Sequence, residues 1–300
     1  MARSAAFPAM APLPALRDVV TLLKPITWFP PMWAMVCGVL SSGVPVASRW
    51  SFLIAGIALA GPLVCGTSQA VNDWFDRHVD AINEPHRPIP SGRIAGRWGL
   101  AISIVWSGVS LLVAALTGPW VLAATTLGLA CAWAYSAPPL RFKTSGWIGP
   151  AVVALSYEGL SWFTGAAVMA GALPSGRVLA VLALYSLGAH GIMTLNDFKA
   201  VVGDRLTGLR SLPVILGERR AALLASAVMA VPQGVVVLLL WRWHLAVPAL
   251  AVAVLLAAQL VLMPRLVADP AARAPWYNAT GVSLYVFGMM AAALGLGGYL

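Results

Sequence analysis

Long apolar runs separated by short polar segments dominate the sequence. A helix needs about 20 apolar residues to cross the roughly 30 Å hydrocarbon core of a bilayer, and nine runs close to that length occur. The pattern predicts an all-α integral membrane protein in which residues 28–300 form one domain, a bundle of nine transmembrane helices, behind an N-terminal tail at residues 1–27. The predicted spans are residues 28–45, 52–72, 99–117, 120–137, 147–171, 178–196, 221–241, 246–263 and 279–299.

The composition excludes a water-soluble domain. Hydrophobic residues make up 60% of the chain and charged residues only 10%, whereas soluble domains carry about 25% charged residues. The net charge of +9 is also typical of nucleic-acid-binding proteins, but in so apolar a chain it favours contact with anionic lipid headgroups and not with nucleic acid. The three cysteines lie in apolar runs without metal-ligand spacing, which predicts buried side chains.

The basic residues are unevenly divided between the two sides of the predicted bundle. The poorer side has only Arg49, Arg177 and Arg242. Because Lys and Arg resist translocation, this bias predicts a cytoplasmic N-terminus and a C-terminus outside. The other sixteen lie in residues 1–27, 73–98, 138–146, 197–220 and 264–278.

Acidic residues gather in two short clusters on the predicted cytoplasmic side. In the first cluster, Asn72, Asp76 and Asp80 recur every four residues. On a continuous helix they share one face, with Asp73 beside them. Carboxylates at this spacing repel one another, so a cation is expected among them.

The second cluster opens with the same Asn-Asp pair, Asn196 and Asp197, and continues through Lys199 to Asp204 and Arg205. Two facing sets of carboxylates suit Mg²⁺, which binds through a few carboxylates together with substrate phosphate oxygens and water. Zinc is disfavoured because no tetrahedral set of Cys and His accompanies the acids.

Cations alternate with these acids. Both signs of charge fit a diphosphate, because its oxygens bridge to a metal and pair with Arg or Lys while a C–O bond breaks. The alternative is a set of solvated loop charges that form only weak ion pairs. The candidate diphosphate-binding residues are Arg77, Arg141, Lys143, Lys199, Arg205 and Arg210.

The segment from Asn72 to Asp80 resembles a known family motif. It matches without a gap the NDxxDxxxD segment of the UbiA superfamily of intramembrane aromatic prenyltransferases, which carry a second Asp-rich segment. The runs NDWFDRHVDAINEPHRPIPSGRI, WAYSAPPLRFK and LNDFKAVVGDRLTGLRSLPV are similar to the chlorophyll and bacteriochlorophyll synthase branch of that superfamily. The runs LLKPITWFPPMWA and GAHGIMTLNDFK resemble its bacteriochlorophyll members most, and the similarity extends over nearly the whole chain.

The resemblance implies Mg²⁺-dependent transfer of a C20 isoprenoid, geranylgeranyl or phytyl, from its diphosphate to the propionate carboxylate of bacteriochlorophyllide, with release of diphosphate. No general base is required, because a carboxylate with a reference pKa of about 4 is ionised at pH 7. The resemblance also implies a bacterial photosynthetic membrane, an active site facing the cytoplasm and pigment-assembly proteins as partners. It assigns metal binding to Asn72, Asp73, Asp76, Asp80, Asp197 and Asp204, and catalysis to Asp76, Asp80, Asp197, Lys199 and Asp204.

The second acidic segment departs from the family pattern at Val202, where relatives commonly carry an acid before the Gly-Asp pair. With one carboxylate fewer, we expect weaker metal binding by this segment, or a second metal that depends on Asp73 or Glu84.

Three more side chains have both a functional and a structural interpretation, and all three are candidate contacts of a tetrapyrrole. His190, two helical turns before Asp197, could ligate a chlorin magnesium or bond to a neighbouring helix. Glu158 is an acid inside an apolar run and could instead bond to a Ser or Tyr hydroxyl. Tyr135 could also hold diphosphate, shield a carbocation or anchor its helix at the interface.

Three other functions share some of these features. A cation-coupled transporter has carboxylates in a helical bundle, but near the membrane midplane and not at one face. A UbiA-type enzyme for another acceptor, such as chlorophyllide, a quinone precursor or haem, would have the same metal site. A pigment carrier without turnover is the third alternative.

Overall fold

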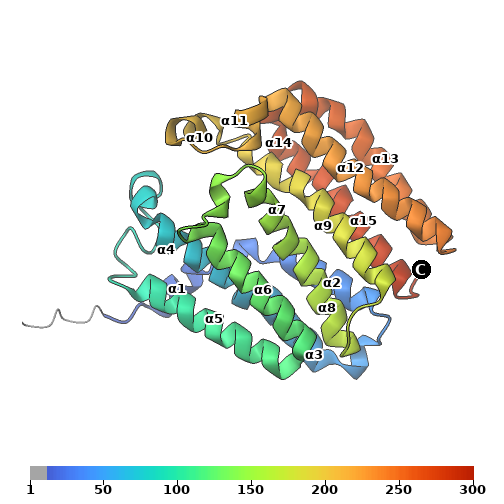
Figure 1. Ribbon diagram of the computed structural model, residues 1–300, viewed down its shortest axis with the longest axis horizontal. Helices are drawn as coiled ribbons and strands as arrows, with labels where there is room; N and C mark the ends of the chain where they lie inside the picture. The colour runs from blue at the N-terminus through green and yellow to red at the C-terminus, as the bar shows by residue number, and fades with distance from the viewer. Residues whose placement is uncertain (1–11) are drawn as a thin grey trace, which may run out of the picture.

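The computed structural model describes residues 12–300, so residues 1–11 of the predicted tail lie outside the described part of the chain. Regular secondary structure within residues 12–300 is helical, with no β-sheet and one isolated bridge between Ser145 and Arg210. The prediction of an all-α protein is confirmed (Figure 1).

The helices follow one another with short connections. The first part of the chain forms α1 (Leu16–Leu22), η1 (Pro25–Thr27), α2 (Phe29–Ser41), η2 (Val46–Ser48), α3 (Trp50–Ala58), η3 (Leu59–Cys65), α4 (Gly66–Asn83), α5 (Trp98–Thr117) and α6 (Pro119–Ser136). The second part forms η4 (Phe142–Thr144), α7 (Ile148–Ala154), η5 (Leu155–Leu160), α8 (Ser161–Ala170), α9 (Gly176–Asp197), α10 (Val201–Thr207), α11 (Leu212–Leu216), α12 (Glu218–Arg242), α13 (Ala246–Ala268), α14 (Pro270–Ala279) and α15 (Gly281–Leu296).

The described residues contain six helical stretches that are long and apolar enough to cross a membrane, and each overlaps a predicted span. The three other predicted spans coincide with α2, α6 and the segment α7–α8, which are helical but outside that set. A multi-pass membrane protein is thus supported, while the number nine stays a prediction. The six stretches are Trp50–Asn83, Trp98–Thr117, Gly176–Asp197, Glu218–Arg242, Ala246–Ala268 and Pro270–Leu296.

Helices α2 and α8 pack with their backbones in contact. A Cβ atom on Gly38 would overlap the carbonyl oxygen of Trp162, and one on Gly165 would overlap the carbonyl oxygen of Met35. Small residues permit such close approach between membrane helices, where dispersion and not hydrophobic burial drives association. The contact also brings η5 against α2 and so fixes one wall of the cavity described below.

The remaining helices flank this pair. Figure 1 shows α5 and α6 on one side of the bundle and α12 and α13 on the other, with α2, α8 and α9 between them. The largest apolar core lies where α9, α12 and α15 meet, around Tyr185, Ala225, Met229 and Met289.

Two π-helices interrupt the regular helices. η3 joins α3 to α4 and contains Pro62, which has no N–H for the α-helical ladder. η5 joins α7 to α8 without a proline. Such π segments occur frequently at functional sites, and here both contribute side chains to one cavity.

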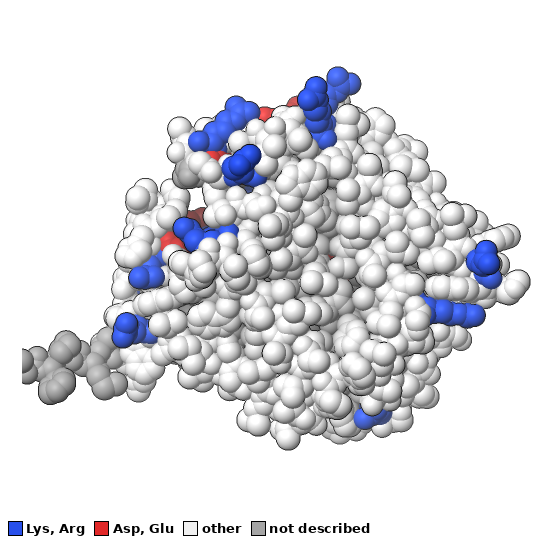
Figure 2. All heavy atoms as spheres, in the orientation of Figure 1, with Lys and Arg blue, Asp and Glu red and all other residues white. Residues whose placement is uncertain are grey.

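Charged side chains gather at one end of the bundle. Figure 2 shows basic atoms around the region of α4, α10 and α11 in Figure 1, with acidic atoms between them, while the broad pale flank is almost free of charge. The structure therefore places both acidic clusters at the same end of the molecule, where the cavity opens.

Candidate active site

A cavity of about 1270 Å³ extends from the charged end into the bundle. Its walls come from α2, η3, α4, α6, α7, η5, α8, α9 and α10, together with the loop after α6. Pockets for single small ligands usually measure about 300–1,000 Å³, so this cavity is large enough for more than one substrate.

Helix α4 supplies the first acidic wall. Asn72, Asp76 and Asp80 all line the cavity, as their four-residue spacing predicts for one helix face. The amide of Asn72 donates to Asp76 Oδ2 over 2.9 Å and to Ser136 Oγ over 3.3 Å. These bonds fix the amide so that its carbonyl oxygen stays available to a cation.

The end of α9 and the start of α10 supply the second acidic wall. Asn196, Asp197, Lys199 and Asp204 line the cavity opposite α4, so the structure brings the two predicted clusters together. Within residues 12–300, Asp197 forms no ion pair, and its carboxylate lies close enough to Asp204 for the two charges to repel each other. A site of this kind attracts a cation.

Three of the six predicted diphosphate-binding cations reach the cavity, namely Arg141, Lys143 and Lys199. Lys143 forms an ion pair with Asp76 and thereby ties the loop after α6 to α4. Tyr135 also lines this part of the cavity. Its position beside Lys143 fits contact with a diphosphate.

The other three predicted cations do not line the cavity. Arg77 donates to the carbonyl of Trp74 over 2.7 Å and lies over the indole ring of that residue at 4.2 Å. Arg205 and Arg210 are exposed, and the carbonyl of Arg210 accepts from the backbone N–H of Gly146. The structure therefore gives these residues surface or structural contacts and corrects their expected place at the diphosphate.

Asp73, a predicted metal ligand, also points away from the cavity. Its side chain is 1% exposed, and Oδ1 accepts from Lys24 Nζ over 2.6 Å and from Arg87 over 3.3 Å. On a helix with 100° between residues, the neighbour of a cavity-facing residue faces the packing side instead. Asp73 thus anchors the chain before α2 to α4, and its assignment as a ligand is corrected.

Arg87 links this anchor to the site, because it also donates to Asp80 Oδ2 over 2.9 Å. Burial by itself lowers the pKa of Arg87, but the negative charges of Asp73 and Asp80 outweigh it and raise the pKa above its ordinary value. The guanidinium is therefore a permanent positive charge behind Asp80.

Replacement of Asp73 by Asn should weaken the fold and spare the metal site. We expect Asp73→Asn to lower the free energy of unfolding by about 1–3 kcal/mol, since Lys24 and Arg87 lose a charged acceptor. Thermal unfolding in detergent measures this change. The Mg²⁺ concentration that gives half-maximal activity should stay within about twofold of wild type. A rise in that concentration comparable to the one in Asp76→Asn would make Asp73 a ligand after all.

Neither His190 nor Glu158 lines the cavity. His190 Nε2 lies 3.2 Å from the carbonyl oxygen of Trp147, on the far side of α9, which supports its structural interpretation. Glu158 is 5% exposed, packs into the core and leaves Oε2 without a hydrogen bond in the described part of the chain. Of the three candidate tetrapyrrole contacts, only Tyr135 faces the cavity.

Val202 has no bearing on the cavity. Its side chain is 74% exposed on α10, while Gly203 and Asp204 beside it line the wall. An acid in this place would face outward as well, so its absence does not remove a carboxylate from the site.

Sequence reasoning missed several polar side chains deeper in the cavity, among them Ser68, Gln69 and Tyr157. Ser68 and Gln69 lie one turn before Asn72 on α4, so the helical repeat of that cluster, extended backward, would have found them. Tyr157 had no such signal, because it lies in η5, where the π turn changes the helical repeat.

The donors at the mouth fit a hard divalent cation. Residues 12–300 contain no group of three or more His, Cys, Asp and Glu side chains close together, as a zinc site needs. Instead, an amide and a few carboxylates face each other from two walls. Mg²⁺ binds in this way when substrate phosphates and water complete its octahedral shell.

Comparison with known proteins agrees with this geometry. Bacteriochlorophyll synthase 33 kDa chain of Cereibacter sphaeroides is 55% identical over 95% of this chain and 95% of its own length. The protein of the same name from Rhodobacter capsulatus is 52% identical over 97% of both chains.

A solved structure shows the same fold. The UbiA homolog from Archaeoglobus fulgidus bound to GPP and Mg²⁺ superposes with a TM-score of 0.71 and 20% identity over 91% of this chain and 99% of that one. Residues 27–297 match the model of the UbiA prenyltransferase family. The resemblance seen in the sequence is thereby confirmed, and the chain belongs to the UbiA prenyltransferase family.

Proposed function

We propose that this chain transfers a C20 isoprenoid, geranylgeranyl or phytyl, from its diphosphate to the propionate carboxylate of bacteriochlorophyllide and releases diphosphate. The family supports prenyl transfer, and the names of the relatives support the pigment acceptor. The products are the pigment ester and diphosphate.

The observation that carries the proposal is the pairing of two acidic walls at the mouth of a large cavity that becomes apolar with depth. Asp76 and Asp80 on one wall face Asp197 and Asp204 on the other. Leu59, Ala60, Val64, Gly128 and Leu160 line the deeper part. A prenyl diphosphate has the same division, with a charged head and an apolar tail.

The metal ligands we propose are Asn72, Asp76, Asp80, Asp197 and Asp204. Bound there, Mg²⁺ would neutralise part of the charge on the diphosphate and make it a better leaving group. Arg141, Lys143 and Lys199 lie at the same level and pair with the remaining phosphate oxygens.

The residues of the cavity then let the reaction proceed without a proton transfer. The bond between C1 of the prenyl chain and the diphosphate oxygen breaks, and the diphosphate keeps the electron pair. A carboxylate oxygen of the acceptor donates an electron pair to C1 and forms the ester. The apolar walls keep water away from the electron-poor allylic carbon, which water would otherwise convert to an alcohol.

The membrane arrangement belongs to the same proposal. Nine helical spans, with the N-terminus in the cytoplasm and the C-terminus outside, put the charged mouth on the cytoplasmic side, where a soluble diphosphate head enters. The membrane we propose is the photosynthetic intracytoplasmic membrane of a bacterium, with pigment-assembly proteins as partners.

The proposal is tested by an assay of the purified protein in lipid nanodiscs with Mg²⁺ and geranylgeranyl diphosphate. Bacteriochlorophyllide a, chlorophyllide a, 4-hydroxybenzoate and haem are compared as acceptors, and products are separated by chromatography. We expect esterified bacteriochlorophyllide as the main product, and EDTA should reduce its formation at least about 100-fold because the acidic walls then repel the diphosphate.

Other outcomes would assign other functions. Prenylated hydroxybenzoate or haem without pigment ester would move the protein to another acceptor class. Tight pigment binding without product would favour a carrier. Uptake of a cation into proteoliposomes, without any prenyl transfer, would favour a transporter.

A further inference from the structure

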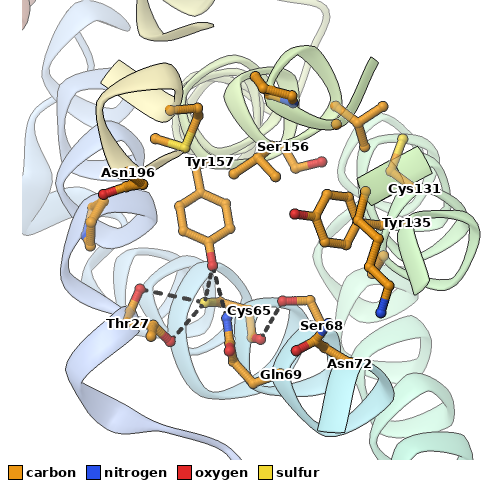
Figure 3. Close-up of a pocket in the computed structure, with 18 of the residues that line it drawn as sticks. Thr27, Cys65, Ser68, Gln69, Asn72, Cys131, Tyr135, Ser156, Tyr157 and Asn196 are labelled. Carbon is orange, nitrogen blue, oxygen red and sulfur yellow. Dashed lines mark hydrogen bonds between the residues drawn. The ribbon is translucent and has the colours of Figure 1, made fainter. Parts of the chain in front are cut away.

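A group of polar side chains lies in the middle of the cavity, between the charged mouth and the apolar end. It consists of Thr27, Cys65, Ser68, Gln69 and Tyr157, and we refer to it as the middle tier. Figure 3 shows Tyr157 projecting across the cavity from η5 toward Cys65 and Gln69 on the opposite wall. Polar groups at this depth are costly unless they have partners.

Hydrogen bonds within the middle tier leave one donor over. The phenolic oxygen of Tyr157 accepts from Gln69 Nε2 over 3.1 Å and from Cys65 Sγ over 3.3 Å. Thr27 Oγ1 donates to the carbonyl of Lys24, and Ser68 Oγ donates to the carbonyl of Cys65. Within residues 12–300, no hydrogen bond uses the hydroxyl proton of Tyr157. Two donors thus hold this hydroxyl in place while its own proton stays available to a ligand.

The depth of the middle tier matches the place of the reacting carbon. Gln69 precedes Asn72 by three residues and Asp76 by seven on α4. With a rise of 1.5 Å per residue, the tier lies about 5 Å below the amide of Asn72 and about 10 Å below Asp76. A diphosphate held at the acidic walls places C1 just below it, and the attacking oxygen must come within about 3–3.5 Å of that carbon.

An anionic acceptor needs a hydrogen-bond donor at this depth. The cations at the mouth, Arg141, Lys143 and Lys199, face the diphosphate. A carboxylate that leaves water for an apolar cavity loses its hydration and is stabilised there by charge-assisted hydrogen bonds. Tyr157 has the free proton that such a bond requires.

We propose that Tyr157 binds the carboxylate of the acceptor, an inference that rests on the function proposed above. Its hydroxyl donates to one carboxylate oxygen, and the other oxygen attacks C1. The electron pair of the attacking oxygen forms the ester bond while the bond from C1 to the diphosphate oxygen breaks, and the proton stays on Tyr157. Gln69 and Cys65 are positioning residues that aim the hydroxyl.

The test compares two pigments that differ only at the carboxylate. Binding of bacteriochlorophyllide and of its propionate methyl ester to protein in nanodiscs is followed by pigment absorbance, without prenyl diphosphate. Tyr157→Phe keeps the aromatic ring and removes the hydroxyl. Tyr185→Phe is the matched control, because Tyr185 is buried outside the cavity with a hydroxyl that lacks a hydrogen bond.

We expect Tyr157→Phe to reduce the preference for the free acid over the methyl ester by about tenfold, the size of one hydrogen bond to a charged group. In the transfer assay, it should raise KM for the acceptor by a similar factor and leave KM for geranylgeranyl diphosphate within twofold. Gln69→Leu should shift the preference in the same direction by a smaller factor. Tyr185→Phe should match wild type in both measurements.

Two results would overturn the inference. One is an unchanged preference in Tyr157→Phe, and the other is an equal rise in KM for both substrates, which would place Tyr157 at the prenyl diphosphate. Wild-type protein that makes no ester would refute the proposed function, and the binding preference would still decide the role of Tyr157.

Discussion

Asp76→Asn is expected to abolish prenyl transfer while the protein stays folded. Asp76 lies at the centre of the first acidic wall, where it accepts from Asn72 and forms the ion pair with Lys143. Asparagine has the same shape but no charge, so Mg²⁺ loses a ligand and Lys143 loses its partner. We expect kcat/KM to fall at least about 100-fold, or about 2.7 kcal/mol of transition-state stabilisation.

The matched control for this experiment is Asp269→Asn. Asp269 caps α14 by accepting from the N–H of Ala272, and it does not line the cavity. Asparagine caps helices as well as aspartate does, so activity and stability should not change. Asp76→Asn with more than about a tenth of wild-type activity would refute the assignment of Asp76 as a metal ligand.

Gly165→Leu should prevent correct packing of the bundle. A side chain at residue 165 would overlap the backbone of Met35, and no rotamer relieves a clash with a carbonyl oxygen on a facing helix. Helices α2 and α8 would have to separate, and with them the wall formed by η5. We expect a loss of more than about 3 kcal/mol, seen as loss of the monodisperse peak in detergent chromatography.

Gly108→Leu is the control for this substitution. Gly108 lies on the exposed face of α5, and a Cβ there meets nothing within 4 Å. Leucine is a better helix former than glycine, so this variant should be at least as stable as wild type. A Gly165→Leu protein that elutes and unfolds like Gly108→Leu would contradict the close contact between α2 and α8.

The first acidic wall could be predicted from the sequence because it depends on local geometry. Residues four apart on a helix share a face, so the spacing of Asn72, Asp76 and Asp80 was enough to place them together. The pairing with Asp197 followed from matched Asn-Asp segments at the ends of two helices on one side. Apolar run lengths similarly located the helices.

The role of Asp73 could not be predicted in this way. Its partners are Lys24, 49 residues earlier, and Arg87, which reaches back after the end of α4. Only the packing of the chain before α2 against α4 shows that this carboxylate is already neutralised. Charge alone made it look like a fourth ligand of the first cluster.

The neighbours Tyr157 and Glu158 show the effect of an irregular helix. An acid within an apolar run is the stronger functional signal in sequence, and it points to Glu158. The π-helix η5 turns Glu158 into the core and Tyr157 into the cavity. A change of helical repeat without a proline leaves no mark in the sequence, so side-chain direction in this segment required the structure.

The central claim is that the acceptor carboxylate attacks C1 of the prenyl chain while the bond to diphosphate breaks. The most direct test uses bacteriochlorophyllide labelled with ¹⁸O at both oxygens of the propionate, with geranylgeranyl diphosphate and Mg²⁺ in nanodiscs. Our account predicts that mass spectrometry finds both labelled oxygens in the ester and none in the diphosphate. An ester that has lost one labelled oxygen would show that the acyl C–O bond breaks instead and would contradict the account.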